Sequence, residues 1–152
     1  MAKPSVSALE AHLGYWLRMV SNHVSGAFQR KLESKGVTAA EWVIMRDLFG
    51  REAANPSEIA AALGMTRGAI SKLIDRLADK GLAVRAASKK DRRYQSVALT
   101  APARALVPSL AALADRNDEE VFSVLSDSER RTLMKLMKKL ARLHGLKEAP
   151  TA

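Results

Sequence analysis

Residues 55–100, NPSEIAAALGMTRGAISKLIDRLADKGLAVRAASKKDRRYQSVALT, are the stretch that decides the fold. Asn55 followed by Pro56 is typical of a helix start, because Asn caps free N–H groups and proline loses nothing at the first helical position. One apolar face follows, and Gly64 ends the segment. The first part of the stretch therefore predicts a short amphipathic helix.

The second part of this stretch predicts another helix and a hairpin. Thr66 is a suitable N-cap, and apolar residues recur at helical spacing as far as Lys80. Gly81 follows as a left-handed C-terminal glycine. Two extended runs come next, at residues 82–86 and 94–99, separated by the polar loop ASKKDRR. Together, the two parts predict two helices joined by a tight turn, followed by a β-hairpin.

Polar caps with a glutamate three residues later mark four helix starts. Such a pair satisfies free N–H groups in both directions. The pairs are Ser7/Glu10, Thr38/Glu41, Asn55/Glu58 and Ser126/Glu129. Outside the central stretch, apolar periodicity predicts helices over residues 7–33, 38–49, 100–125 and 127–144. The predicted fold class is mainly α with a small β-wing.

The composition narrows the set of partners. The 152 residues have a formal net charge of +9, which favours nucleic acid first and an anionic membrane surface second. There is no cysteine, which excludes disulfides and thiolate sites. No signal-peptide pattern or long apolar run is found, so we expect a cytoplasmic protein. Few aromatic residues argue against single-strand binding by base stacking.

Positive charge is concentrated in the hairpin. Between Arg85 and Arg93 a single acidic residue accompanies five basic ones, and a charge run of this kind is often only a solvated loop. Its position directly after two helices joined by a turn instead predicts contact with DNA phosphates or the minor groove. The basic residues are Arg85, Lys89, Lys90, Arg92 and Arg93, with Asp91 between them.

The helix that starts after Thr66 has a polar face suited to a major groove. The N-terminal half of such a helix normally meets base edges. Arg67 could pair with guanine, and Arg76, two turns later, is better placed for phosphate. An ordinary solvated face is the alternative. The expected base-reading set is Thr66, Arg67, Gly68, Ser71 and Lys72, with Asp75 on the same face.

These segments resemble the MarR family of bacterial transcription regulators. The matching pieces are LGYWLRMV at residues 13–20, the block at 55–85, the wing sequence DRR, and VALT at 97–100. The resemblance covers nearly the whole length. From the family's Asp-x-Arg wing pattern, the resemblance implies that Arg93 enters the minor groove and that Asp91 braces it.

The resemblance implies a homodimer that binds double-stranded DNA at a pseudo-palindromic operator. Residues 1–152 would form a single domain, with a winged helix–turn–helix lobe at 37–100 and dimerisation helices at 7–34 and 101–146. The residues independently support part of this, because the long apolar face of the first helix and the leucine and methionine seam of the last exceed what one small lobe can cover.

Members of the family often bind small aromatic or phenolic compounds between the dimerisation helices and the lobe. Core or dimer packing is the alternative role for the residues in that region. The candidates are Tyr15, Trp16, Met19, His23, Trp42 and Met45. The absence of cysteine excludes thiol-based peroxide sensing. His12, His23 and His144 lie on separate turns or helices, so we expect no metal site and no cofactor.

The sequence therefore predicts a dimeric, sequence-specific DNA-binding regulator, a repressor released by a small ligand. The alternative is an architectural protein that binds DNA irrespective of sequence. An enzyme is not expected, because no phosphate-binding loop, nucleophile motif or paired carboxylates are found. The basic last helix could also bind a membrane surface, but a solvated helix face is the simpler interpretation of its charges.

Overall fold

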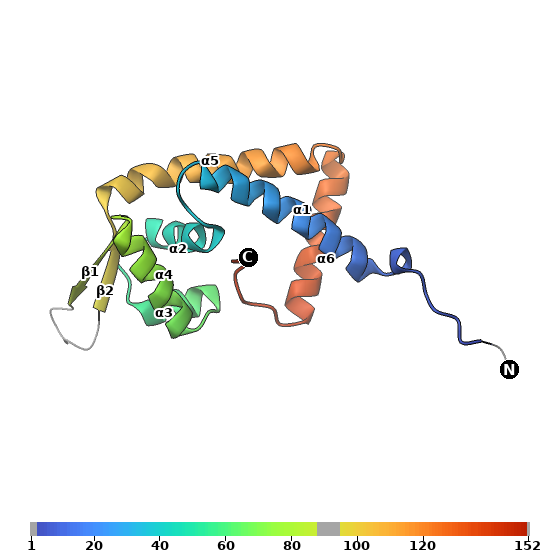
Figure 1. Ribbon diagram of the computed structural model, residues 1–152, viewed down its shortest axis with the longest axis horizontal. Coiled ribbons are helices and arrows are strands. Elements are labelled where there is room, and N and C mark those ends of the chain that lie inside the picture. Colours follow the sequence, from blue (N-terminus) through green and yellow to red (C-terminus); the bar gives the residue numbers. More distant parts are fainter. Residues whose placement is uncertain (1–2, 88–94, 152) are drawn as a thin grey trace.

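The computed structural model describes residues 3–87 and 95–151, and it confirms a mainly helical fold with a two-stranded wing (Figure 1). Helix α5 lies along α1, while α2, α3, α4 and the sheet form a lobe at one end, and α6 descends from the far end of α5. The elements are η1 (Leu9–Ala11), α1 (Leu13–Glu33), α2 (Ala39–Phe49), α3 (Pro56–Leu63), α4 (Arg67–Asp79), β1 (Ala83–Ala87), β2 (Gln95–Leu99), α5 (Ala101–Phe122) and α6 (Asp127–Leu143).

The hydrophobic core lies within the lobe and beneath α5. Strands β1 and β2 pair antiparallel, in a register that sets Ala83 opposite Leu99. Ala54 extends the sheet by exchanging two backbone hydrogen bonds with Val97, at 2.9 and 2.8 Å. Fully buried side chains from every layer of the lobe meet here, among them Ile44, Leu48, Ile59, Ile70, Ile74, Leu77 and Val97. The sheet and α2 thus support α4 from behind.

Most predicted helix starts are correct. Thr38 and Glu41 form a reciprocal capping box, as do Ser126 and Glu129. Asn55 caps α3 by accepting from the Glu58 N–H, but its side-chain amide, and not its backbone N–H, donates to the Glu58 carboxylate. Local side-chain chemistry thus determines where these helices begin.

The predicted start of the first helix at Ser7 is wrong. The α-helix begins at Leu13, after a 3₁₀ turn and an extended His12 that makes no side-chain cap. The Trp16 indole N–H donates to the Glu10 carbonyl over 2.9 Å, which ties the turn to the first turn of the helix. Glu10 therefore lies before the helix, where it cannot complete a capping box.

Helices α1 and α5 are joined by a polar contact across their long interface. Asn117 of α5 is almost fully buried; it donates to the Val24 carbonyl and accepts from Lys31, both on α1. Lys31 also pairs with Glu120 at 2.8 Å. Because both the oxygen and the nitrogen of the buried Asn117 amide find partners on α1, the contact fixes the register of the two helices.

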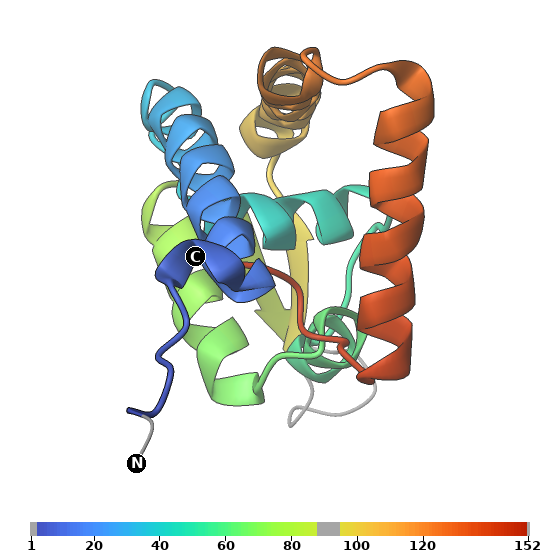
Figure 2. The same cartoon turned by 90° about the vertical axis from the view of Figure 1, so that its right-hand side faces the viewer.

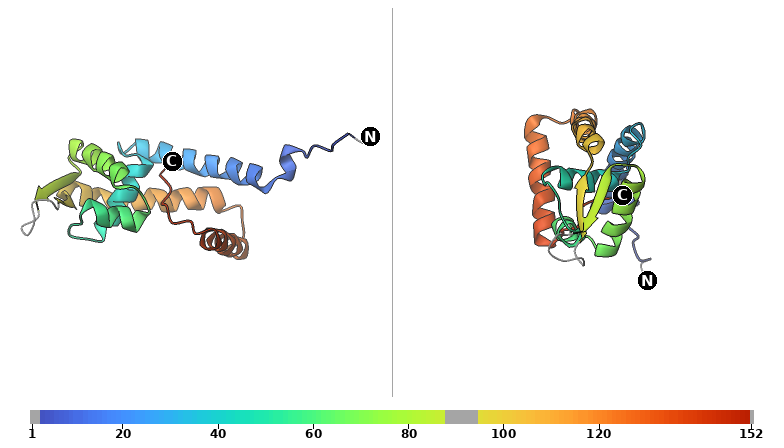
Figure 3. Two further views of the ribbon diagram at one scale, coloured as in Figure 1. Left: turned by 90° about the horizontal axis from the view of Figure 1, so that it is seen from below. Right: turned by 90° about the vertical axis from the view of Figure 1, so that its left-hand side faces the viewer.

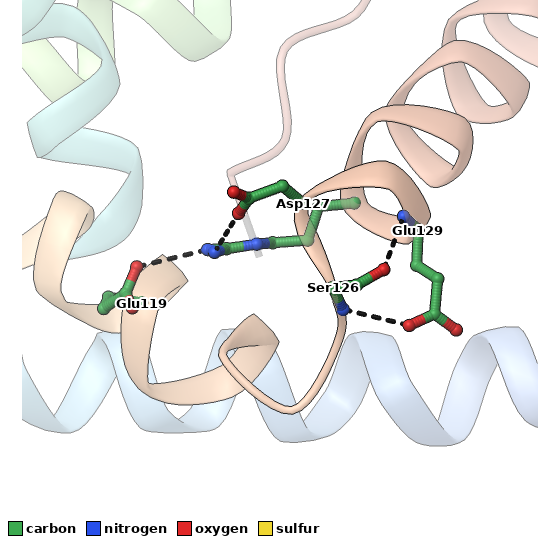
Figure 4. A network of polar contacts seen from close by, with 5 residues as sticks. Glu119, Ser126, Asp127 and Glu129 are labelled. Atoms are coloured by element: carbon green, nitrogen blue, oxygen red, sulfur yellow. Dashed lines mark hydrogen bonds and ion pairs between the residues drawn. The ribbon is translucent and has the colours of Figure 1, made fainter.

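Helix α6 turns away from the end of α5, at the end of α5 that lies far from the lobe (Figures 1 and 2). The corner is held by Arg130, which pairs with Glu119 at 3.2 Å and Asp127 at 2.9 Å, next to the Ser126 and Glu129 capping box (Figure 4). No residue of α6 is buried in the described single chain. Its leucine and methionine face is therefore available for a partner.

Candidate nucleic-acid interface

Helix α4 has one buried face and one exposed face, as its sequence predicts. Ile70, Leu73, Ile74 and Leu77 are buried against the lobe. The opposite face is polar and lies on the outside of the molecule. Exposed there are Thr66, Arg67, Gly68, Lys72 and Arg76, whereas Ser71 is half-buried. The structure thus brings the predicted base-reading residues together on the N-terminal half of one exposed helical face.

Thr66 has a structural role in addition to its exposure. Its hydroxyl oxygen accepts from the Ala69 N–H over 3.1 Å and so caps the helix. The hydroxyl proton is still available as a donor, because a threonine oxygen can accept and donate at once. Thr66 therefore sets the first turn of α4, from which Arg67 and Gly68 project.

The C-terminal end of α4 is fastened by a lysine. The Lys80 ammonium donates to the buried Glu41 carboxylate at 2.8 Å and to the Gly36 carbonyl at 2.9 Å. Burial would raise the pKa of Glu41, but hydrogen bonds from Lys80 and Thr38 together hold that pKa below its usual value of 4.5. The ionised carboxylate thus ties α4 to the start of α2 and to the loop before it.

The middle of α4 is fastened by Arg85 of β1, and this changes the expected role of that residue. Its guanidinium pairs with Asp75 at 2.7 Å and donates to the Ser71 carbonyl at 3.1 Å and to Gln95 at 2.8 Å. From the sequence, Arg85 was expected to be one of the cations with which the hairpin contacts DNA. In the structure its charge is matched by Asp75, so Arg85 joins the sheet to α4.

The remaining basic residues predicted for the hairpin lie outside the described part of the chain. This applies to Lys89, Lys90, Arg92 and Arg93, and to Asp91, which was expected to brace Arg93. Their role in DNA contact stays a prediction. The described strands pair as far as Ala87 and Gln95.

The six candidate ligand residues do not line one common hollow in the described single chain. Met45 is fully buried in the core of the lobe. His23 lines a hollow between α1 and α5, and Trp42 lines a different one beside Leu63. Tyr15 and Trp16 contact each other edge to face on α1, and Trp16, like Met19, is exposed. A shared cleft would need a further surface beside α1.

Two further observations concern metal binding and membrane insertion. Within residues 3–87 and 95–151, no group of three or more histidine, aspartate or glutamate side chains is arranged to hold a metal ion. None of the helices in the described part of the chain combines the length and apolar character needed to span a bilayer.

Sequence reasoning missed the two fastenings of α4. The capping box revealed Glu41 as a helix-start residue, but nothing near it in sequence points to Lys80. Likewise, Asp75 and Arg85 are ten residues apart on different elements. A helix followed by a strand can bring two residues ten positions apart into contact. In the sequence, only the opposite charges of Asp75 and Arg85 pointed to such a contact.

Comparison with known proteins agrees with this architecture. Residues 37–94 match the MarR family model. A Thauera aromatica protein described as a putative transcriptional regulatory protein for the hcr operon is 29% identical over 136 residues, covering 89% of this chain and 82% of that protein.

Two solved structures extend the similarity to most of the chain. A mutant of MarR from E. coli complexed with operator DNA has a TM-score of 0.76 and 26% identity, over 84% of this chain and 92% of that one. CouR from Rhodococcus jostii RHA1 bound to p-coumaroyl-CoA has a TM-score of 0.74 and 26% identity, over 90% of this chain and 96% of that one. Residues 37–94 of the chain thus match the MarR family, and the fold of most of the chain is similar to that of MarR, a winged helix–turn–helix DNA-binding protein.

Proposed function

We propose that the chain is a homodimeric repressor that binds a specific double-stranded DNA operator and is released by a small ligand. The main observation behind this proposal is the exposed polar face of α4, on a helix that is capped at its start and fastened to other elements at its middle and end. These contacts with α2 and β1 hold the exposed face of α4 in a fixed position on the lobe. Rigid placement is what base readout demands, because hydrogen bonds to base edges tolerate little displacement.

Each exposed residue of α4 has a proposed role. Arg67 reads a guanine, and Thr66, Ser71 and Lys72 reach other base edges or phosphates. Gly68 allows the backbone close to the DNA, since a Cβ there would meet no described atom within 4 Å beyond its own helix backbone and chain neighbours. Arg76 contacts phosphate. From the hairpin, Lys89, Lys90, Arg92 and Arg93 contact the backbone and the minor groove.

The exposed apolar surface outside the lobe supports a dimer. Leu13, Leu17 and Val20 of α1 are 89%, 59% and 47% exposed, and Leu136 and Leu140 of α6 are 51% and 53% exposed. Apolar patches of this extent usually mark an interface. A two-fold dimer would bury them in pairs and present two α4 helices to one face of the DNA.

A small effector is the third part of the proposal. It is supported by CouR, a protein of similar structure that is bound to p-coumaroyl-CoA. In this chain Tyr15, Trp16, Met19 and His23 follow one side of α1, and Trp42 borders a hollow on α2. We propose that the second copy completes a cleft there, and that occupation of the cleft changes the spacing of the two lobes.

The first test is operator binding by an Arg67→Ala variant. Loss of a bidentate contact with guanine should cost about 1–3 kcal/mol and relax the preference at one base pair. Arg131→Ala, which removes an exposed arginine from the face of α6 away from its leucines, is the matched control and should leave affinity and preference unchanged. Selection from a randomised operator library measures both. An unaltered preference in Arg67→Ala would remove the readout role.

A second test separates the regulator from an architectural protein. A regulator should bind its own promoter at least about 10³-fold more tightly than random DNA. Competition experiments at several salt concentrations give this ratio, and also the number of phosphates contacted, at a slope of about −0.9 each. A ratio near one would favour the architectural alternative.

A further inference from the structure

The described chain continues beyond the end of α6. Gly145 adopts a left-handed φ of 63°, and the Leu146 N–H donates to the Ala141 carbonyl at 2.8 Å while the Gly145 N–H donates to the Arg142 carbonyl. This pair of bonds closes the helix and turns the chain sharply. The following segment, residues 147–151, is called the tail below. It runs from α6 back toward the lobe (Figure 3).

The tail is seated on the turn between α3 and α4. The Ala149 N–H donates to the Leu63 carbonyl at 2.8 Å, and Ala149 is half-buried. At Gly64 a Cβ would lie 2.6 Å from the Lys147 carbonyl oxygen and 2.8 Å from its carbon. These are backbone atoms and cannot swing aside as a flexible side chain can. Gly64 thus leaves the space that the tail backbone occupies.

The position of this contact gives it consequences for DNA binding. Leu63 and Gly64 are separated only by Met65 from Thr66, the N-cap of α4. Thr66 and Arg67, the first residues proposed to read bases, therefore lie within one helical turn of the contact. Helix α6, from which the tail comes, contains no buried residue and is proposed to lie in the dimer interface. The tail is a direct covalent route from that interface to the start of the recognition helix.

We propose that the tail positions the N-terminal end of α4 relative to the dimerisation helices, and so sets the spacing of the two recognition helices on DNA. This rests on the proposed function as a dimeric DNA-binding protein. With the tail seated, the lobe is held by α1 and α5, which enter and leave it and share its core, and also by the tail at the α3–α4 turn. Without the tail, the turn loses its connection to α6 and the lobe can pivot where α1 and α5 join it.

The first experiment tests whether the tail and Gly64 interact in solution. Gly64→Ala is made in the full chain and in a chain ending after Leu146, and the thermal unfolding midpoint is measured for each. Gly81→Ala is the matched control, because Gly81 also has a positive φ, of 74°, and has no described atom within 4 Å of a Cβ. Both substitutions strain the backbone, but only Gly64→Ala also displaces the tail.

The expected result is a coupling confined to Gly64. The midpoint should fall further for Gly64→Ala in the full chain than in the shortened chain, whereas the fall for Gly81→Ala should be equal in both. Equal falls for Gly64→Ala in the two chains would show that the tail is not seated there and would overturn the proposal.

The second experiment measures the effect on DNA. Operators are prepared with the natural half-site separation and with one or two base pairs added or removed. The shortened chain should bind the natural operator about tenfold more weakly than the full chain and discriminate less among separations, while keeping the dimer mass and the salt slope. Equal weakening at every separation would indicate a general loss of structure and would overturn the positioning role.

The outcomes separate this inference from the proposed function. Full affinity and full discrimination by the shortened chain would overturn the positioning role and leave the regulator intact. Failure of the full chain to prefer any operator over random DNA would overturn the proposed function itself.

Discussion

At the scale of single residues, Glu41 shows how one side chain can serve two elements. Its carboxylate receives the Thr38 N–H at 2.8 Å as part of the capping box of α2, and the same oxygen receives Lys80 from the end of α4. The side chain is fully buried. A buried carboxylate is stable in its ionised form only when such donors surround it, and here the donors outweigh the effect of burial on the pKa.

The lowered pKa of Glu41 predicts a pH dependence of stability. Because the folded-state pKa lies below the unfolded value, the stabilisation is complete above the usual value of 4.5 and is lost as the pH falls through the folded pKa. Glu41→Gln should reduce the free energy of unfolding by about 1–3 kcal/mol at neutral pH. The difference from the unaltered chain should shrink toward acidic pH, as measured by urea unfolding at several pH values.

Glu33→Gln serves as the control, since Glu33 is an exposed carboxylate at the end of α1. Its effect should stay within about 0.5 kcal/mol at every pH. A gap between the Glu41→Gln variant and the unaltered chain that widens in acid would contradict the assigned ion pair.

At the scale of elements, the position of α4 depends on its contacts with the sheet, although its own sequence determines where the helix begins and ends. Arg85 reaches from β1 across to Asp75 and Ser71. The pair is partly exposed, so its electrostatic contribution to stability is small, about 0.2–1 kcal/mol. Its larger effect is geometric, because it fixes the distance between α4 and the two strands.

A double-mutant cycle tests this geometric role. Arg85→Met and Asp75→Asn should each weaken operator binding several-fold, and the double variant should bind about as well as the weaker single one. The matched control is the pair formed by Arg116 and Glu120, which is 2.9 Å long and lies on α5 away from the lobe. Operator titrations provide the readout. Additive losses for Arg85 and Asp75 would indicate separate contacts with DNA instead of one brace.

At the scale of the whole molecule, the exposed apolar faces of α1 and α6 form the interface of the proposed dimer. Fully burying a leucine contributes about 1.5–3 kcal/mol, and a two-fold interface buries each leucine twice. Leu140→Glu should therefore raise the dimer dissociation constant at least about 100-fold. Lys138→Glu introduces the same side chain on the opposite face of α6 and should leave the dimer intact.

Sedimentation equilibrium measures the masses of both variants, and operator binding follows in the same samples. The Leu140→Glu variant should lose operator affinity in parallel with dimer mass, because two half-sites are bound together. A monomeric unaltered chain with full operator affinity would contradict the dimer proposal.

The sequence by itself determined the local elements of this protein. Caps, glycines and apolar periodicity act within a few residues, so the two capping boxes, the bounds of α2, α3 and α4, and the exposed polar face of α4 could all be predicted. The start of α1 could not, because Trp16 binds Glu10 in a turn that a cap pattern does not describe.

Only the tertiary structure decided which charges are paired and which segments meet. Arg85 counts as a groove-binding cation in the sequence and is paired with Asp75 in the fold, Met45 lies in the core, and Lys80 finds a carboxylate 39 residues away. The contact between the tail and Gly64 was likewise decided by the tertiary structure. These contacts depend on the packing of distant elements, which no local pattern encodes, since side-chain neighbours across a core are set by chain topology and not by spacing along the chain.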